Sequence, residues 1–117
     1  MDLLSKLFGP PVPSVTAKEL SEKLKAMKRP LVIDVRQPEE YQAGHIIGAK
    51  LIPLGTLGQR MQELPKGKEI VCVCASGSRS SSAAKQLIKA GFTVLDMRGG
   101  MMTWQRAGLP VKKGSIA

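Results

Sequence analysis

The sequence has few cysteines, few aromatic side chains and no long apolar run. Its two cysteines, Cys72 and Cys74, lie two positions apart, where strand side chains point the same way and a disulfide is geometrically poor. With one histidine besides, the chain lacks the usual four-ligand zinc set, so we expect no metal and two free thiols, as in a reducing compartment. No stretch approaches the ~18 apolar residues of a membrane span, and the N-terminus lacks the pattern of a secretory signal. We therefore expect a cytoplasmic protein without a membrane span.

Acidic residues are also scarce relative to basic ones. Eighteen Lys and Arg stand against nine Asp and Glu, a formal net charge of +9 and a pI near 10.0. Such a surface attracts anions. The lysines are scattered, however, and one Trp, one Tyr and two Phe offer little for stacking on bases. The composition favours a solvated basic surface and does not favour nucleic acid as a partner.

The 117 residues suffice for one domain with a single core. Residues 1–13 end in the breaker "GPPVP" and are predicted to be a leader or linker, which leaves residues 14–117 as the domain. In the domain, Thr16 is a predicted helix N-cap, followed by Leu20, Leu24 and Met27 on one helical face.

Strand and helix patterns alternate along the rest of the domain. A helix is predicted from Pro38 to Gln42, before Gly44, with further helical stretches in "TLGQRMQEL" and "SSSAAKQLIKAG". Continuous apolar runs, typical of strands covered on both faces, are "PLVIDVR", "EIVCVC" and "FTVLDM", with a shorter candidate in "GAKLIPL". The alternation predicts an α/β fold with a mostly parallel central sheet and helices on both faces.

Cys74 falls at the end of a predicted central strand, where α/β proteins bind ligands. The short segment after it comprises Ala75, Ser76, Gly77, Ser78, Arg79 and Ser80. Its backbone N–H groups can turn inward as an anion-binding nest, and Gly77 permits the backbone angles that this needs. A cysteine at a helix N-terminus beside an arginine favours the thiolate, which is a nucleophile. Cys72, inside the strand, is expected to be inert packing, with a resolving thiol as the alternative.

The segment "CASGSRS" resembles the active-site loop of the rhodanese sulfurtransferases, in the single-domain form C-x-x-G-x-R-S. Agreeing segments occur in the family's order over roughly residues 14–111: "VIDVRQPEEYQAGHIIGA", "IPL" and "RGGMMTWQRAGLPV". Two positions depart from the family pattern, Ile47 for a proline and Leu51 for an asparagine, both away from the cysteine loop. The resemblance implies a rhodanese-like fold and a sulfurtransferase.

The family's reaction implies a persulfide on Cys74. The thiolate attacks the outer sulfur of a small anionic donor such as thiosulfate, and a thiol or cyanide later accepts that sulfur; no cofactor is implied. The amides from Ala75 to Ser80 would bind the persulfide anion as an oxyanion hole binds oxygen. This chemistry requires a thiol that solvent can reach. Arg79 would orient the anionic donor, and the serines would add hydroxyl donors, with Ser80 as a helix cap in the alternative.

Three other polar residues are expected to have supporting roles. Asp34 and Arg36 end a strand on the same sheet edge as Cys74, and we assign them a supporting role. The resemblance implies that this pair organises the loop, with Arg36 pairing to Glu39 or Glu40, while a purely structural ion pair is the favoured interpretation of the residues themselves. His45 is expected to form a turn-fixing hydrogen bond, because transfer from a preformed thiolate needs no general base.

Other functions stay open at this level. A sulfur-relay module that receives persulfide from a protein partner would use the same chemistry at Cys74. A cysteine phosphatase is a weaker alternative, since its loop is one residue longer than the four residues between Cys74 and Arg79. A catalytically inactive interaction domain is disfavoured by the cysteine itself.

Overall fold

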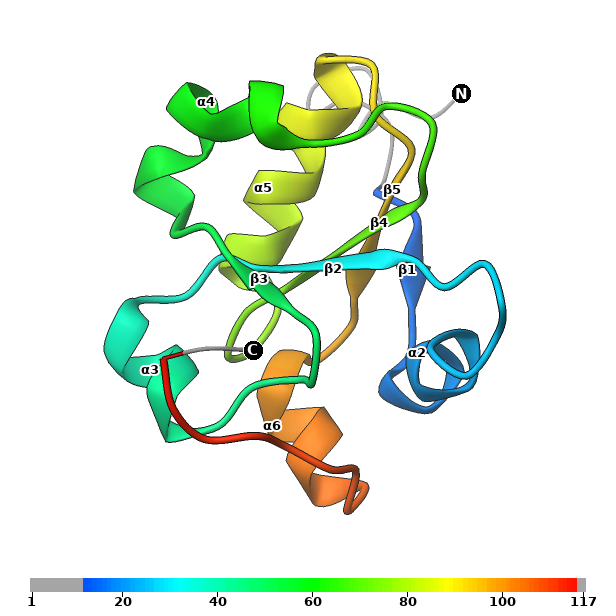
Figure 1. The fold of residues 1–117 in the computed structure, drawn as a ribbon, viewed down its shortest axis with the longest axis vertical. Coiled ribbons are helices and arrows are strands. Elements are labelled where there is room, and N and C mark those ends of the chain that lie inside the picture. The colour runs from blue at the N-terminus through cyan, green and yellow to red at the C-terminus, as the bar shows by residue number, and fades with distance from the viewer. Residues whose placement is uncertain (1–11, 116–117) are drawn as a thin grey trace, which may run out of the picture.

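The computed structural model describes residues 12–115 and is built on one parallel sheet of five strands (Figure 1). Along the chain these are β1 (Ser14–Val15), β2 (Leu31–Asp34), β3 (Lys50–Leu51), β4 (Ile70–Val73) and β5 (Val94–Met97). In the sheet their order is β1-β5-β4-β2-β3, and every pairing is parallel. The predicted α/β fold is confirmed, and β4 lies at the centre of the sheet, where both of its edges are hydrogen-bonded.

Helices cover both faces of this sheet. They are α2 (Ala17–Lys23), α3 (Pro38–Ala43), α4 (Leu57–Arg60) between the 3₁₀ turns η1 (Leu54–Thr56) and η2 (Met61–Glu63), α5 (Ser78–Lys89) and α6 (Gly100–Arg106). One buried cluster, called the α5-side cluster below, joins the sheet to α4 and α5, through Leu57 and Leu87 among others. A second joins the opposite face to α2, α3 and α6, through Leu20, Tyr41 and Trp104. In Figure 1, α4 and α5 accordingly lie on the other side of the strands from α2 and α6.

The first helix begins as predicted but ends early. The Thr16 hydroxyl accepts the Glu19 N–H at 3.1 Å, and the Glu19 carboxylate accepts the Thr16 N–H at 2.8 Å, which completes a capping box. The helix stops at Lys23, and the chain turns back toward β2. Met27, predicted to share one helical face with Leu20 and Leu24, lies beyond the helix and has a relative exposure of 102%. That part of the prediction is wrong, because the apolar spacing continues beyond the last helical turn.

The start of the described chain forms the sheet edge. The Pro13 carbonyl accepts the Asp96 N–H at 2.9 Å, and Val12 packs against the α5-side cluster. Strand β1, only two residues long, was not predicted. Residues 1–11 of the predicted leader lie outside the described residues, and no helix within residues 12–115 is long and apolar enough to cross a membrane.

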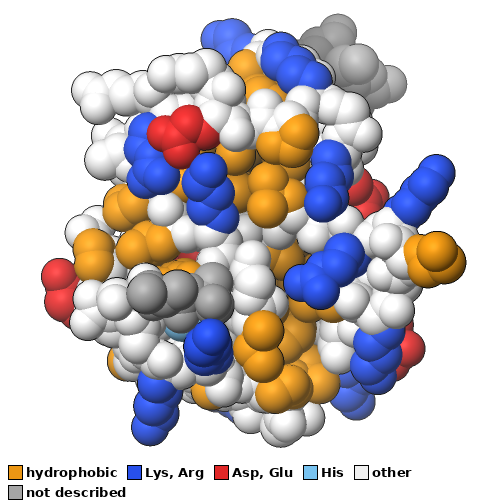
Figure 2. Space-filling model, viewed as in Figure 1, with side chains coloured by type: hydrophobic (Ala, Val, Ile, Leu, Met, Phe, Trp, Pro, Cys, Tyr) orange, Lys and Arg blue, Asp and Glu red, His pale blue; other side chains and the backbone are white. Residues whose placement is uncertain are grey.

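Basic side chains are spread over the surface. Figure 2 shows Lys and Arg distributed across the visible face, with apolar and uncharged side chains between them. Some are neutralised locally: Lys50 and Arg60 lie 3.1 and 2.9 Å from Glu63. These contacts lower the pKa of Glu63 to about 2, chiefly through the hydrogen bond from Arg60.

Candidate functional site

Cys74 immediately follows β4, at the carboxyl edge of the sheet. Its side chain packs in the α5-side cluster, and the residue is only 1% exposed. Both cysteines are free, as expected. The expectation of a solvent-accessible thiol is wrong for this conformation, since the loop that follows the cysteine covers its sulfur.

The loop that follows Cys74 donates a hydrogen bond to its sulfur. The Gly77 N–H donates to Cys74 Sγ at 3.0 Å, and Gly77 has a φ of +113°, which favours glycine over any L residue. Helix α5 starts at the next residue with Gly77 as its N-cap, so Ser80 is not the cap. The N–H groups of that first turn have no intrahelical acceptor, as at any helix start. The loop therefore provides one amide donor to the sulfur, at the start of a helix whose first N–H groups have no partner within the helix.

Ser80 contacts the sulfur from the helix. Its Oγ lies 3.3 Å from Cys74 Sγ, where it accepts the thiol proton, and its own hydroxyl donates to the Gly77 carbonyl at 3.2 Å. Ser80 is fully buried, whereas Ser76 and Ser78 are exposed. Of the three loop serines, only Ser80 has a hydroxyl at hydrogen-bond distance from the sulfur in the described structure.

Helix α6 holds the carbonyls of the same loop. The Met101 N–H donates to the Cys74 carbonyl at 2.8 Å, and the Met102 N–H donates to the Ala75 carbonyl at 3.1 Å. Gly100 has a φ of +60°, and a Cβ there would lie 2.5 Å from backbone atoms of Cys74 and Ala75. This contact was missed from the sequence, although the glycine pair before a helix was its signal. Because the carbonyls are bound by α6, they face away from the sulfur.

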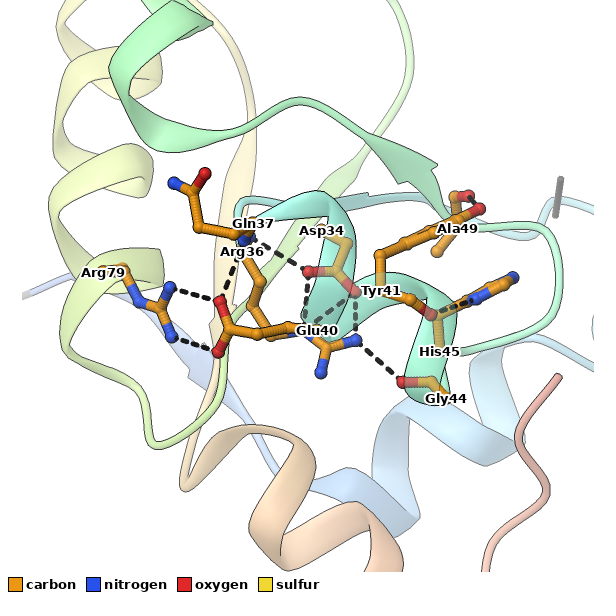
Figure 3. A network of polar contacts seen from close by, with 9 residues as sticks. All are labelled: Asp34, Arg36, Gln37, Glu40, Tyr41, Gly44, His45, Ala49 and Arg79. Atoms are coloured by element: carbon orange, nitrogen blue, oxygen red, sulfur yellow. Dashed lines mark hydrogen bonds and ion pairs between the residues drawn. The ribbon is translucent and has the colours of Figure 1, made fainter. Parts of the chain in front are cut away.

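Arg79 is held by a carboxylate from the other side of the loop (Figure 3). Its Nη1 and Nη2 donate to the two Glu40 carboxylate oxygens at 2.7 and 2.8 Å. This bidentate bond, with smaller help from the Gln37 N–H, outweighs burial and lowers the pKa of Glu40 to about 2. The same bond raises the pKa of Arg79. The predicted role of Arg79 toward an anionic donor stays a prediction, and Glu40 is the residue with which such a donor would compete.

Asp34 and Arg36 form a buried pair of their own. Arg36 Nε and Nη2 donate to the Asp34 carboxylate at 2.9 and 2.7 Å, and Nη2 also donates to the Gly44 carbonyl at 2.8 Å. The predicted pairing of Arg36 with Glu39 or Glu40 is therefore wrong: Arg36 binds Asp34, and Glu40 binds Arg79. As Figure 3 shows, the pair joins the end of β2 to the end of the helix that carries Glu40.

Comparison with known proteins now assigns a family. A family model described as the rhodanese-like domain matches residues 16–107. The chain belongs to this family. A sulfurtransferase of Allochromatium vinosum is 37% identical over 101 residues, 86% of this chain and 94% of its own length. YrkF of Bacillus subtilis carries the provisional name of a sulfur carrier protein and is 36% identical over 80% of this chain and 51% of its own.

A solved structure agrees with the family assignment. The crystal structure of a rhodanese-like domain protein from Staphylococcus aureus has a TM-score of 0.81 and 34% identity, and the match covers 89% of this chain and 100% of that chain. The rhodanese-like fold suggested by the motifs is thus confirmed.

Two further residues of this rhodanese-like domain were expected to be structural. The Cys72 side chain is fully buried, and burial, followed by Asp96 and Cys74, raises the pKa of its thiol to about 12. His45 Nδ1 donates to the Tyr41 carbonyl at 2.8 Å. The imidazole ring of His45 also stacks on the phenol ring of Tyr41, with their centroids 3.6 Å apart. Both observations agree with packing and turn-fixing roles.

Proposed function

We propose that this chain transfers a sulfane sulfur through a persulfide on Cys74. The single observation that carries the proposal is the position of Sγ: it ends the central strand, 3.0 Å from the Gly77 N–H and under the first turn of α5. Amides and a helix N-terminus aimed at one sulfur stabilise negative charge there. A persulfide would place its anionic outer sulfur about 2 Å from Sγ, where such donors could bind it.

Small anionic donors of a sulfane sulfur, such as thiosulfate, suit this site. The Cys74 thiolate forms a bond to the outer sulfur of thiosulfate, the sulfur–sulfur bond of thiosulfate breaks, and its electron pair leaves with sulfite. A thiol or cyanide then takes the outer sulfur, and Cys74 leaves as the thiolate. Because the residue is 1% exposed, the loop over it must move to admit the donor.

Arg79 is proposed to orient the donor anion. Its guanidinium keeps further N–H groups beyond the two that bind Glu40, and the side chain is 34% exposed, so it can reach solvent. The other loop groups proposed for substrate binding are Ala75, Ser76, Gly77, Ser78 and Ser80, through their amides or hydroxyls. Asp34 and Arg36 act indirectly, by fixing the C-terminal end of α3, the helix that carries Glu40 in its first turn.

The second candidate is a sulfur relay, in which a partner protein delivers the persulfide. The provisional name of YrkF supports it, because that relative is described as a carrier. The chemistry at Cys74 is the same, and only the donor differs.

Intact mass spectrometry separates these functions. Wild type, Cys74→Ser and the matched control Cys72→Ser are incubated with thiosulfate or with a persulfidated desulfurase. We expect wild type and Cys72→Ser to gain one sulfur atom and Cys74→Ser to gain none. Gain only from the protein donor would favour the relay. A sulfur retained by Cys74→Ser, or hydrolysis of an aryl phosphate in place of any sulfur gain, would refute the proposal.

A further inference from the structure

Asp96 is a carboxylate placed under the catalytic loop. It lies on β5, directly opposite Cys72 on β4. Val94, two positions earlier, packs in the α5-side cluster, so the Asp96 side chain faces α5 as well. Its Oδ1 is buried and has no hydrogen-bond partner among residues 12–115. A buried acceptor without a donor costs on the order of 1–3 kcal/mol, so the position calls for a functional reason.

Ser80 lies between this carboxylate and the nucleophile. Its Oγ is 3.3 Å from Cys74 Sγ. It is also near enough to Asp96 that a side-chain hydrogen bond from Ser80 acts on the pKa of that carboxyl. The Ser80 proton points to the Gly77 carbonyl at 3.2 Å here, but a hydroxyl has one proton and rotates. Turned toward Asp96, it completes a chain from the Cys74 thiol through Ser80 to the carboxylate.

The charged surroundings leave Asp96 free to take a proton. β1 faces it with Ser14, which does not ionise, and β4 faces it with Cys72. The two lysines of α5 are exposed, and Arg79 is bound to Glu40. Arg98, which directly follows β5, is exposed and donates to Ser14 Oγ at 2.8 Å. Burial raises the pKa of Asp96, and the nearby Ser80 hydroxyl offsets only part of that shift.

The buried thiol needs such an acceptor. With Cys74 1% exposed and its thiol directed at Ser80, bulk water has no direct route to the proton. We propose that Asp96 accepts the Cys74 thiol proton through the Ser80 hydroxyl while Cys74 attacks the sulfur donor. The inference rests on the sulfur transfer proposed above. In this proposal Asp96 is a positioning residue that acts on Cys74 through Ser80. Cys74 then starts the reaction as a thiol, whereas the sequence predicted a preformed thiolate.

The step balances within the site. The thiol proton passes to Ser80 Oγ as the Ser80 proton passes to Asp96 Oδ1, and the Sγ electron pair forms the bond to the outer sulfur of thiosulfate. The sulfur–sulfur bond of thiosulfate breaks toward sulfite. When a thiophile removes the outer sulfur, Cys74 recovers its proton from Asp96 by the same route.

The test is the pH profile of Cys74 reactivity in Asp96→Asn. Asparagine keeps the shape of the side chain but cannot take the proton. We expect persulfide formation from thiosulfate to be slower than wild type by about tenfold or more at about pH 7, and equal to wild type at about pH 9.5, where hydroxide that enters when the loop opens for the donor takes the proton in place of Asp96. Ser80→Ala should show the same pH-dependent loss. Glu22→Gln, at an exposed carboxylate far from the site, is the matched control and should match wild type throughout.

Two outcomes overturn the proposal. If Asp96 is only a neighbouring negative charge, removing it favours the thiolate, and Asp96→Asn is as fast as wild type or faster near neutral pH. If its role is structural, the loss is the same at every pH. Alkylation by iodoacetamide, followed over the same pH range, also requires the thiol to lose its proton but involves no sulfur transfer. It therefore tests Asp96 even if the proposed function fails, and it shows which of the two has failed.

Discussion

Replacing Glu40 by glutamine tests whether the Arg79–Glu40 pair stabilises the site. The lowering of the Glu40 pKa from 4.5 to about 2 would correspond to about 3.4 kcal/mol at 1.36 kcal/mol per unit. Both side chains are about one-third exposed, 34% and 33%, so solvent screening reduces the expected stabilisation to about 1 kcal/mol. For a domain of this size, that corresponds to a fall in Tm of about 4 °C in Glu40→Gln at neutral pH.

The pH dependence gives the sharper test. Because the folded-state pKa is lowered, the stabilisation is complete above the ordinary value of 4.5 and is lost as pH falls toward about 2. Thermal melts should therefore show the gap between wild type and Glu40→Gln closing across that window. Glu22→Gln, which breaks a pair whose side chains are 71% and 75% exposed, is the control and should leave Tm nearly unchanged. A gap that persists at pH 2, or equal effects of the two variants, would refute the reasoning.

Three further outcomes are expected. Asp34→Asn should lower the free energy of unfolding by about 3–5 kcal/mol in urea titrations, because it leaves a buried arginine without its partner; a loss below about 1 kcal/mol would contradict this. Gly100→Ala should destabilise the domain more than Gly108→Ala, which also has a positive φ but no atom within 4 Å of the added Cβ; equal thermal stabilities would show that contact with the loop is unimportant. In Cys74→Ser, the remaining thiol of Cys72, with its pKa raised to about 12, should resist iodoacetamide until the protein is unfolded, and rapid labelling of the folded protein would count against its burial.

The sheet and the cysteine loop could be predicted because their signals are local. Continuous apolar runs mark buried parallel strands, and the succession of strand, cysteine, glycine and helix lies within a few consecutive positions. Gly77 has the positive φ that the loop was expected to need. The end of α2 could not be predicted in the same way, since the sequence up to Met27 retains helical spacing and the turn toward β2 is a tertiary effect.

The partners of the charged residues were the main error at the site. Two arginines and three carboxylates compete there, and sequence spacing favoured the nearer pair. In the structure Arg79 binds Glu40 across 39 positions, and Arg36 turns back on Asp34. Burial of the thiol and the approach of Asp96 likewise depend on how β5 and α5 pack, which no local pattern encodes.

The bonds from Met101 and Met102 to the carbonyls beside Cys74 have a consequence for biosynthesis. The nucleophile is translated well before the helix that orients its backbone. While the ribosome is still adding the last part of the chain, the cysteine is present but its pocket is unfinished. A nascent or prematurely terminated polypeptide that lacks α6 would thus carry the reactive residue without the two hydrogen bonds that hold its backbone.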